Sequence, residues 1–177
     1  MRKQQKGFSL IELLIVVAII LIIAAIAIPN LMRARMAANT SSAAASERTI
    51  VTGEISYSAA FPTIGFTSLL ALGGTEGVAC VPSNTTACLI DANLANNGTP
   101  PGAGKSGYTF AVTDVTAAPS LIPNEFVTTG TALSLTTGTT AFCAVDDGVV
   151  RSVAPGTAAN VAVGGYGACQ ALAPLQN

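Results

Sequence analysis

Histidine and tryptophan are absent from this 177-residue chain, and only 10% of its residues are charged. Without histidine the chain lacks the usual general base and the commonest metal ligand. It also cannot hold a Ser, His and Asp set, and no pair of acids stands out, so the sequence predicts no catalysis. A nucleic-acid groove needs a clustered basic face, and a formal net charge of −1 argues against one.

What the chain has instead is an apolar run over residues 8–28. A helix of that length spans roughly 30 Å, the hydrocarbon thickness of a bilayer. Basic residues precede it, as in a secretory signal peptide or a plain membrane anchor: Arg2, Lys3 and Lys6. A signal peptide would end in a small-residue cleavage site, whereas here helix-forming residues continue past the run. A plain anchor leaves Glu12 unexplained, because a carboxylate within a span is costly.

The segment KGFSLIELLIVVAIILIIAAIAIPN resembles the N-terminal segment of type IV prepilins and of the related pseudopilins of type II secretion. In that family a short basic leader ends in Gly, followed by Phe, then Thr or Ser, and then a Glu four residues after the Phe. The matching positions here are Lys6, Gly7, Phe8, Ser9, Glu12 and Pro29. The motif gives no information about the chain beyond about residue 60.

The resemblance implies how this N-terminal segment is processed. A prepilin peptidase would cut between Gly7 and Phe8 on the cytoplasmic face, and the new Phe8 amine would be N-methylated. Glu12 would then pair with the cationic Phe8 amine of a neighbouring subunit and set the register between subunits. Such a pair attracts strongly in low dielectric, whereas either charge alone is heavily penalised. The alternative is that Glu12 sits at the interfacial end of the span and snorkels to water.

The resemblance also implies an α+β type IV pilin fold, with a long N-terminal helix whose hydrophobic half protrudes and whose other half packs on a small antiparallel β-sheet head. Residues 1–7 would be the leader, 8–28 the transmembrane and filament-core helix, 29–60 its amphipathic continuation, and 61–177 the head with a loop region. Pro29 lacks an amide hydrogen, so we expect the helix to bend or open locally there.

The head reads as loops and short strands. FPTIG, residues 61–65, should end the helix, and SLLALGG should form one helical turn. Alternating apolar segments predict strands at 108–113, 131–137, 140–145 and 148–153. The DDG at 146–148 indicates a tight hairpin between the last two.

One segment, TPPGAGKSG at residues 99–107, is similar to a phosphate-binding P-loop, although Thr99 stands where the pattern has Gly. A working P-loop follows a buried strand and opens a helix. Lys105 and Ser106 lead instead into the predicted strand at 108–113. We therefore predict a Gly/Pro loop, no bound nucleotide and no cofactor.

Two further patterns carry little weight. Asp146 and Asp147, with Asp91 or Asp114, could bind calcium, but adjacent carboxylates in a hairpin are more typical of a plain turn, and no metal site is predicted.

Three asparagines begin N-x-(S/T) patterns, a weak indication of glycosylation in a bacterial chain: Asn39, Asn84 and Asn97.

The four cysteines permit three disulfide connectivities. A head beyond the membrane meets oxidising conditions, so we expect disulfides and favour Cys80 with Cys88 and Cys143 with Cys169. The turn-forming VPSNTTA lies between the first two, and the second pair encloses the DDG hairpin. Four buried free thiols or a metal site are the alternatives, although the spacing lacks the paired C-x-x-C of zinc ribbons.

Two functions follow from the resemblance. One is a structural subunit of a type IV pilus, a surface filament for adhesion, twitching motility or DNA uptake; the other is a major pseudopilin of a type II secretion system. A C-terminal cysteine pair around the last hairpin is typical of pilins, and the long Thr-rich loop suits a fibre surface, so both favour the pilus. An enzyme or an anchored binding domain is a distant third.

The resemblance implies four partners: copies of the chain in a helical filament, the prepilin peptidase and methyltransferase, an inner-membrane assembly platform, and the membrane itself before assembly. The expected location is therefore the inner membrane, crossed once, before assembly, and the extracellular pilus filament afterwards.

Overall fold

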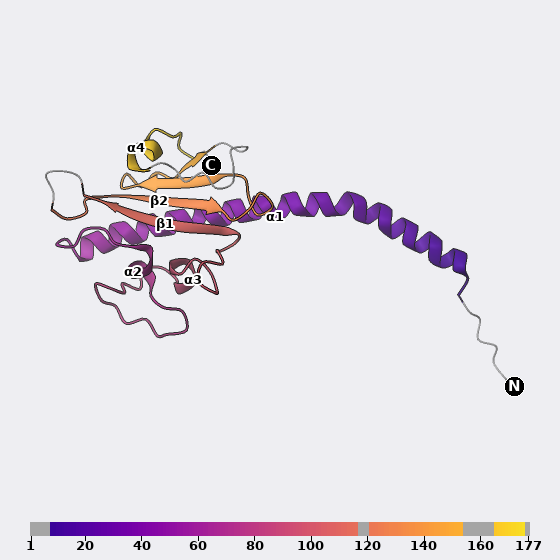
Figure 1. The fold of residues 1–177 in the computed structure, drawn as a ribbon, viewed down its shortest axis with the longest axis horizontal. Coiled ribbons are helices and arrows are strands. Elements are labelled where there is room, and N and C mark those ends of the chain that lie inside the picture. The colour runs from indigo at the N-terminus through magenta and orange to yellow at the C-terminus, as the bar shows by residue number, and fades with distance from the viewer. Residues whose placement is uncertain (1–7, 117–120, 154–164, 176–177) are drawn as a thin grey trace. The chain divides into compact units, whose positions relative to one another are not determined.

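The computed structural model describes residues 8–116, 121–153 and 165–175. Within these residues the chain forms one long helix, a small sheet and three short helices, arranged as in Figure 1. The elements are α1 (Leu10–Ala60), α2 (Leu69–Gly73), α3 (Ala92–Ala95), β1 (Tyr108–Val115), β2 (Glu125–Ala132), β3 (Ala141–Val145), β4 (Arg151–Val153) and α4 (Gly165–Gln170). This α+β arrangement confirms the fold class expected from the sequence.

The chain divides into two compact units, Met1–Arg35 and Met36–Asn177. The boundary falls inside α1, because the buried residues of that helix begin at Ala43 and end at Tyr57. Residues 36–60 of α1 therefore fold with the head rather than with the apolar run.

In the first unit, α1 is apolar on all sides, and its long aliphatic side chains are exposed from Leu10 to Leu31. By length and composition this helix could cross a membrane, because a helix satisfies its own backbone hydrogen bonds. Pro29 cannot donate to the carbonyl of Ala25, four residues earlier. The structure nevertheless assigns a single α1 that continues across Pro29.

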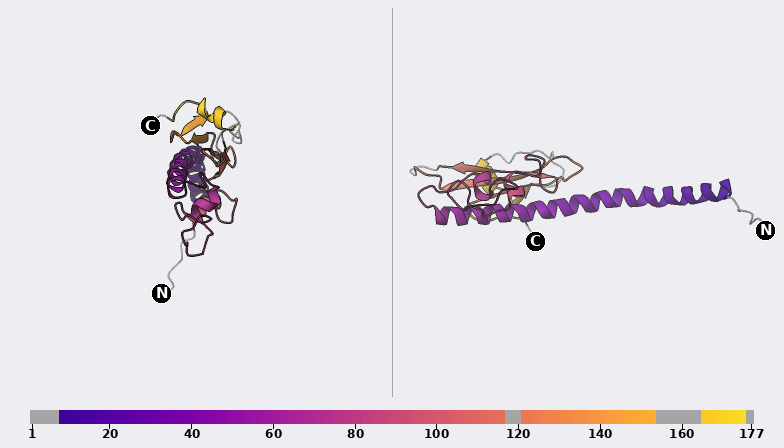
Figure 2. Two further views of the ribbon diagram at one scale, coloured as in Figure 1. Left: turned by 90° about the vertical axis from the view of Figure 1, so that its left-hand side faces the viewer. Right: turned by 90° about the horizontal axis from the view of Figure 1, so that it is seen from below.

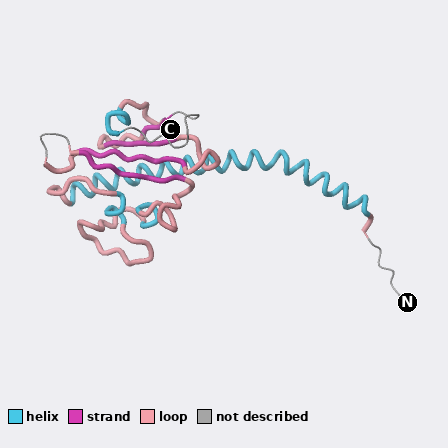
Figure 3. The backbone as a smooth tube through the Cα atoms, viewed as in Figure 1, coloured by secondary structure: helices cyan, strands magenta, loops and turns pink. Residues whose placement is uncertain are grey.

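The four strands form one antiparallel sheet in the order β1-β2-β3-β4, so each strand pairs with its neighbours in the chain (Figure 3). Phe110 of β1 lies opposite Gly130 of β2. Between β3 and β4 the Gly148 N–H donates to the Val145 carbonyl at 3.0 Å, with Gly148 at φ +75°. This turn confirms the hairpin that DDG predicts.

Strand alternation gives the sheet two apolar faces. Phe126 of β2 and Phe142 of β3 point to residues 36–60 of α1 and join the larger core there. Val127 and Val145 point to the other side, where they pack with Cys169 of α4. The head therefore has three layers, with the sheet between α1 and α4 (Figure 2).

The predicted strand at 131–137 is wrong. The strand is β2, which ends at Ala132, and the next residues turn, with the Thr137 hydroxyl and N–H both donating to the Ser134 carbonyl at 2.9 and 3.1 Å. The TALSLTT alternation imitates a strand, but Ser and Thr side chains stabilise local turns by bonding nearby backbone. The true strand was hidden because β2 is covered on both faces, so its buried residues are consecutive rather than alternating.

Other boundaries follow the sequence more closely. α1 ends at Ala60, just before FPTIG, and α2 lies within SLLALGG, as predicted. The short helices α3 and α4 were not predicted, because four and six residues are too few to show a helical period.

Candidate functional site

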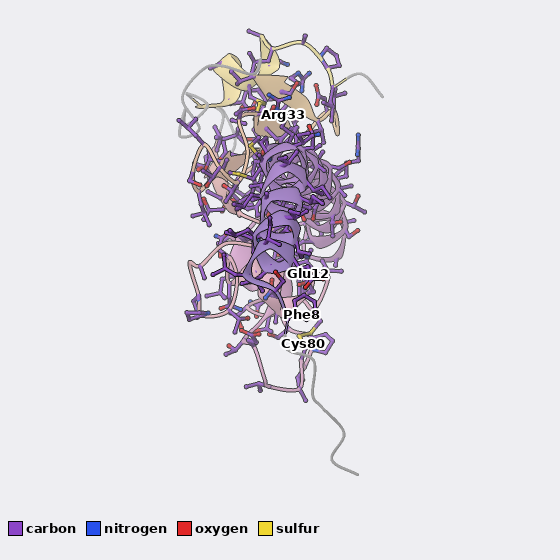
Figure 4. The ribbon with its side chains drawn as sticks, turned by 90° about the vertical axis from the view of Figure 1, so that its right-hand side faces the viewer. Phe8, Glu12, Arg33 and Cys80 are labelled. Carbon is purple, nitrogen blue, oxygen red and sulfur yellow. A yellow bond between two sulfur atoms is a disulfide. The ribbon has the colours of Figure 1, made fainter. Side chains whose placement is uncertain are left out.

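Phe8, Ser9 and Glu12 lie at the N-terminal end of α1, and Figure 4 labels Phe8 and Glu12 there. Phe8 and Ser9 precede the helix, and Phe8 is 82% exposed. The Ser9 N–H donates to Glu12 Oε2 at 2.9 Å, and the Ser9 carbonyl accepts from the Leu13 N–H at 3.3 Å. Ser9 is thus the N-cap of α1, and Glu12, three residues later, reaches back to its amide, as in a capping box.

The capping role was readable in the sequence but missed, because S-x-x-E before an apolar run is a helix-start signal. It also places a carboxylate in the first turn, where the positive end of the helix dipole favours an anion. Each carboxylate oxygen has two lone pairs, so the exposed Glu12 can accept the Ser9 N–H and still meet a cation. Gly7, the other residue of the predicted cleavage site, lies outside the described residues.

Both disulfides are present, and they join the cysteines that the sequence analysis pairs. Cys143 of β3 and Cys169 of α4 are fully buried in the core on the α4 side of the sheet. The bond between Cys80 and Cys88 closes a loop whose turn is fixed by the Ser83 N–H, which donates to a carbonyl three residues on at 2.8 Å.

The segment that resembles a P-loop leads into β1, as the sequence indicates. Lys105 Nζ lies 2.8 Å from Asp91 Oδ2, and the Ser42 hydroxyl donates to the Ser106 hydroxyl at 3.0 Å. Lys105 and Tyr108 bridge each other at the start of the strand. Both residues that would hold a phosphate thus contact the protein itself.

Three of the four acidic residues considered for calcium have structural partners. Asp147 Oδ2 lies 2.5 Å from Arg151 Nη2, and this hydrogen bond to Arg151 lowers the Asp147 pKa. Asp146 accepts a hydrogen bond from Tyr166, which raises the Tyr166 pKa to about 12. Asp91 caps α3 by accepting the N–H of the third helical residue. Within the described ranges no three potential metal ligands gather.

The three N-x-(S/T) asparagines differ in their surroundings. The Asn39 amide donates to the Thr137 carbonyl at 3.0 Å. The Asn97 amide donates to the Phe110 carbonyl at 2.6 Å and accepts from the Phe110 N–H. Asn84 is exposed on the loop closed by the Cys80–Cys88 disulfide, so its amide is the most accessible of the three.

Known proteins resemble this chain in its N-terminal segment and over a longer alignment. Residues 2–28 match the family described as the prokaryotic N-terminal methylation motif. Over 97 residues the chain is 38% identical to the type IV wide pilus major component PilA4 of Thermus thermophilus, an alignment that covers 51% of this chain and 68% of that protein. The chain belongs to the type IV pilins. No solved structure matches this pilin.

The family match concerns the N-terminal segment of the pilin, residues 2–28, rather than its head. The motif match includes Ser9 and Glu12, which a hydrogen bond joins at the start of α1, and Phe8 just before them. In the described part of the head, Asp91 caps α3 and pairs with Lys105, and Arg151 pairs with Asp147. These contacts stabilise the fold of the head.

Proposed function

We propose that this type IV pilin is a structural subunit of a type IV pilus, assembled through its N-terminal helix into a surface filament and without enzymatic activity. The observation that carries this proposal is the exposed apolar part of α1, which begins with a carboxylate in its first turn. Such a surface is unfavourable in water and must be covered by lipid or by other helices. Filament assembly exchanges the first cover for the second.

Processing would prepare this helix for assembly. The motif match supports cleavage after Gly7 on the cytoplasmic face, followed by methylation of the Phe8 amine. Cleavage removes the basic leader and creates a cation at Phe8, four residues before Glu12. The prepilin peptidase and methyltransferase are the partners for this step, and an inner-membrane platform is the partner for the next.

In the filament, the Phe8 amine of one subunit would pair with Glu12 of its neighbour. Among packed apolar helices an unpaired charge is strongly unfavourable, so a subunit shifted along the bundle would leave both groups without partners. The pair therefore fixes the axial position of each subunit. Pro29 would let α1 bend or open where the bundle requires it, since the carbonyl of Ala25 is already without its amide partner.

A major pseudopilin of type II secretion is the second candidate. The relative, which is a wide pilus major component, supports the pilus instead. The Cys143–Cys169 disulfide around the β3–β4 hairpin supports it too, because the resemblance associates such a pair with pilins. The expected locations are the inner membrane before assembly and the extracellular filament afterwards.

Intact-mass analysis of fibres sheared from cells tests the proposal. We expect a chain that begins at Phe8 and carries a methyl group on its amine. Replacing Gly7 with a bulky residue such as Leu should block cleavage and abolish fibres, because the residue before the scissile bond must fit the peptidase, whereas Gly7→Ala should be the mildest change. Fibres built from chains that retain residues 1–7 would contradict the proposal. A deletion strain that keeps its fibres but loses protein secretion would favour the pseudopilin.

A further inference from the structure

Two glutamates of α1 are buried between the helix and the sheet. Glu47 and Glu54 have no exposed surface. They are seven positions apart, so they lie on the same face of the helix, about two turns apart. Glutamate is almost never fully buried unless it is paired, and neither residue takes part in an ion pair within the described ranges.

Glu47 lies under the centre of the sheet. Neither of its carboxyl oxygens has a hydrogen-bond partner. A Cβ added to Gly130 of β2 would lie 2.8 Å from Glu47 Oε1, and the Phe110 ring of β1 closes the same space. The Thr128 hydroxyl donates to the Ala144 carbonyl at 3.4 Å, and it also faces the Glu47 carboxyl, where its effect of lowering the Glu47 pKa is smaller than the effect of burial. The carboxyl therefore occupies a space that exists because residue 130 has no side chain.

Glu54 lies nearer the end of α1. Its Oε2 accepts the Thr67 N–H at 3.1 Å, whereas Oε1 has no partner. From the sheet, the charge of Asp114 in β1 raises the Glu54 pKa further, because two carboxylates repel each other. On the helix itself, Arg48 is exposed. Thr128 and the Thr67 N–H each favour a carboxylate, but burial disfavours it more strongly at both sites, and Asp114 adds to this at Glu54.

We propose that the interface between α1 and the sheet is a pH-sensitive switch: Glu47 and Glu54 each hold a proton in the folded head, and their ionisation loosens the sheet from the helix. A protonated carboxyl is neutral and can donate a hydrogen bond, so it can remain in this apolar interface. A carboxylate there must draw in water or separate the two layers, because a buried charge without a partner is heavily penalised.

The direction of the pH dependence follows from proton binding. Burial raises the pKa of Glu47 and of Glu54 from 4.5 to about 8. Between these values the folded head binds more protons than the unfolded chain, so stability falls as pH rises. It is greatest below the unfolded pKa and falls no further above the folded one. Each group can raise the unfolding equilibrium constant by up to about tenfold per pH unit in this window.

Unfolding of the full-length chain in detergent, at a series of pH values across this window, tests the switch. The buried Tyr57 and Tyr108 report on the fold by near-ultraviolet circular dichroism. We expect the unfolding constant to rise with pH in the wild type. Glu47→Gln and Glu54→Gln should each remove up to about tenfold per pH unit of this rise. Glu76→Gln, at an exposed acid, is the control that should leave the slope unchanged. A double Gln variant with the wild-type slope would overturn the proposal.

A second measurement does not depend on the variants folding. Infrared spectra of wild-type protein with labelled glutamate distinguish protonated carboxyls from carboxylates. We expect protonated glutamate at about pH 6.5, well above the usual Glu pKa, and its loss above about pH 9. Spectra that show only carboxylate at the lower pH would overturn the proposal. Because the readout is the protonation of glutamate side chains and not fibre formation, it does not depend on whether the chain forms a pilus.

Discussion

Glu12 has one contact within its own chain and a second, proposed contact in the filament. Within the chain it accepts the Ser9 N–H at the start of α1. In the filament it would meet the Phe8 amine of a neighbour. An Ala substitution removes both interactions at once, so a failure to assemble would not tell them apart. The two roles differ in charge, because the cap needs an acceptor and the pair needs an anion.

Glu12→Gln separates these roles. Its amide oxygen can still accept the Ser9 N–H, but it cannot neutralise the Phe8 amine. We expect both Glu12→Gln and Glu12→Ala to be processed and inserted, yet to enter fibres poorly beside wild-type subunits, because an unpaired buried charge costs about 3–5 kcal/mol. The measurement is the share of tagged variant in sheared fibres.

The possible outcomes are distinct. If Glu12→Gln enters fibres like the wild type and Glu12→Ala does not, the cap is what matters. Normal incorporation of both variants would remove Glu12 from the assembly mechanism altogether.

Residue identity alone could not reveal the surroundings of Glu47 and Glu54. In the sequence they alternate with apolar residues such as Ile50 and Val51, as solvent-facing acids of an amphipathic helix would. The space that holds the Glu47 carboxyl depends on Gly130, more than 80 positions away, and only the strand register brings that residue over Glu47. The Phe8 and Glu12 pattern is local, by contrast, and was therefore visible.

Among the elements, those set by local chemistry were predicted and those set by packing were not. α1 ends before FPTIG, and the β3–β4 turn follows from DDG, because Pro and Gly act on their own backbone. The position of β2 depends instead on which residues the other layers cover. Consecutive burial at Phe126 and Val127 requires α1 on one side and α4 on the other, and no local pattern encodes that.

The two disulfides should differ in their contribution to stability. The Cys143–Cys169 bond closes a loop of sequence separation 26, and the Cys80–Cys88 bond one of 8. Chain entropy alone gives about 3.5 and about 2.5 kcal/mol. Replacing each pair with Ala and measuring urea unfolding should show the larger loss for the buried C-terminal pair, where the sulfurs also fill the core. A larger loss from the exposed loop pair would contradict this ranking.

At the scale of the molecule, the chain consists of two units that differ in where their apolar side chains lie: they are exposed in the first unit and form a core in the second. Both apolar clusters of the head are made of residues from Ala43 to Leu175, all within the second unit. The exposed aliphatic side chains of α1 lie mostly within the first. The head should thus not need the apolar run in order to fold.

A fragment of residues 36–177 should therefore be soluble and folded, with both disulfides formed. Size-exclusion chromatography, near-ultraviolet circular dichroism and peptide mapping without reduction would measure this. A matched fragment of residues 61–177 should fail to fold, because it lacks Ile50 and Tyr57 of the core. Aggregation or loss of fixed aromatic signals in the longer fragment would show that the head depends on the first unit.

The Cys143–Cys169 bond also decides how a fibre subunit would carry a mechanical load. Tension on the C-terminal end first reaches the Leu175 N–H bond to the Val150 carbonyl and the bridge beside Arg151. Once these two contacts break, the disulfide bond transmits the force from Cys169 directly to Cys143 in β3. β4, which lies between the two cysteines in the chain, then carries none of this load. The force therefore does not separate β4 from β3 first. It acts on the longer ladder of hydrogen bonds between β2 and β3. The C-terminal tail can thus extend only a short way before the sheet resists.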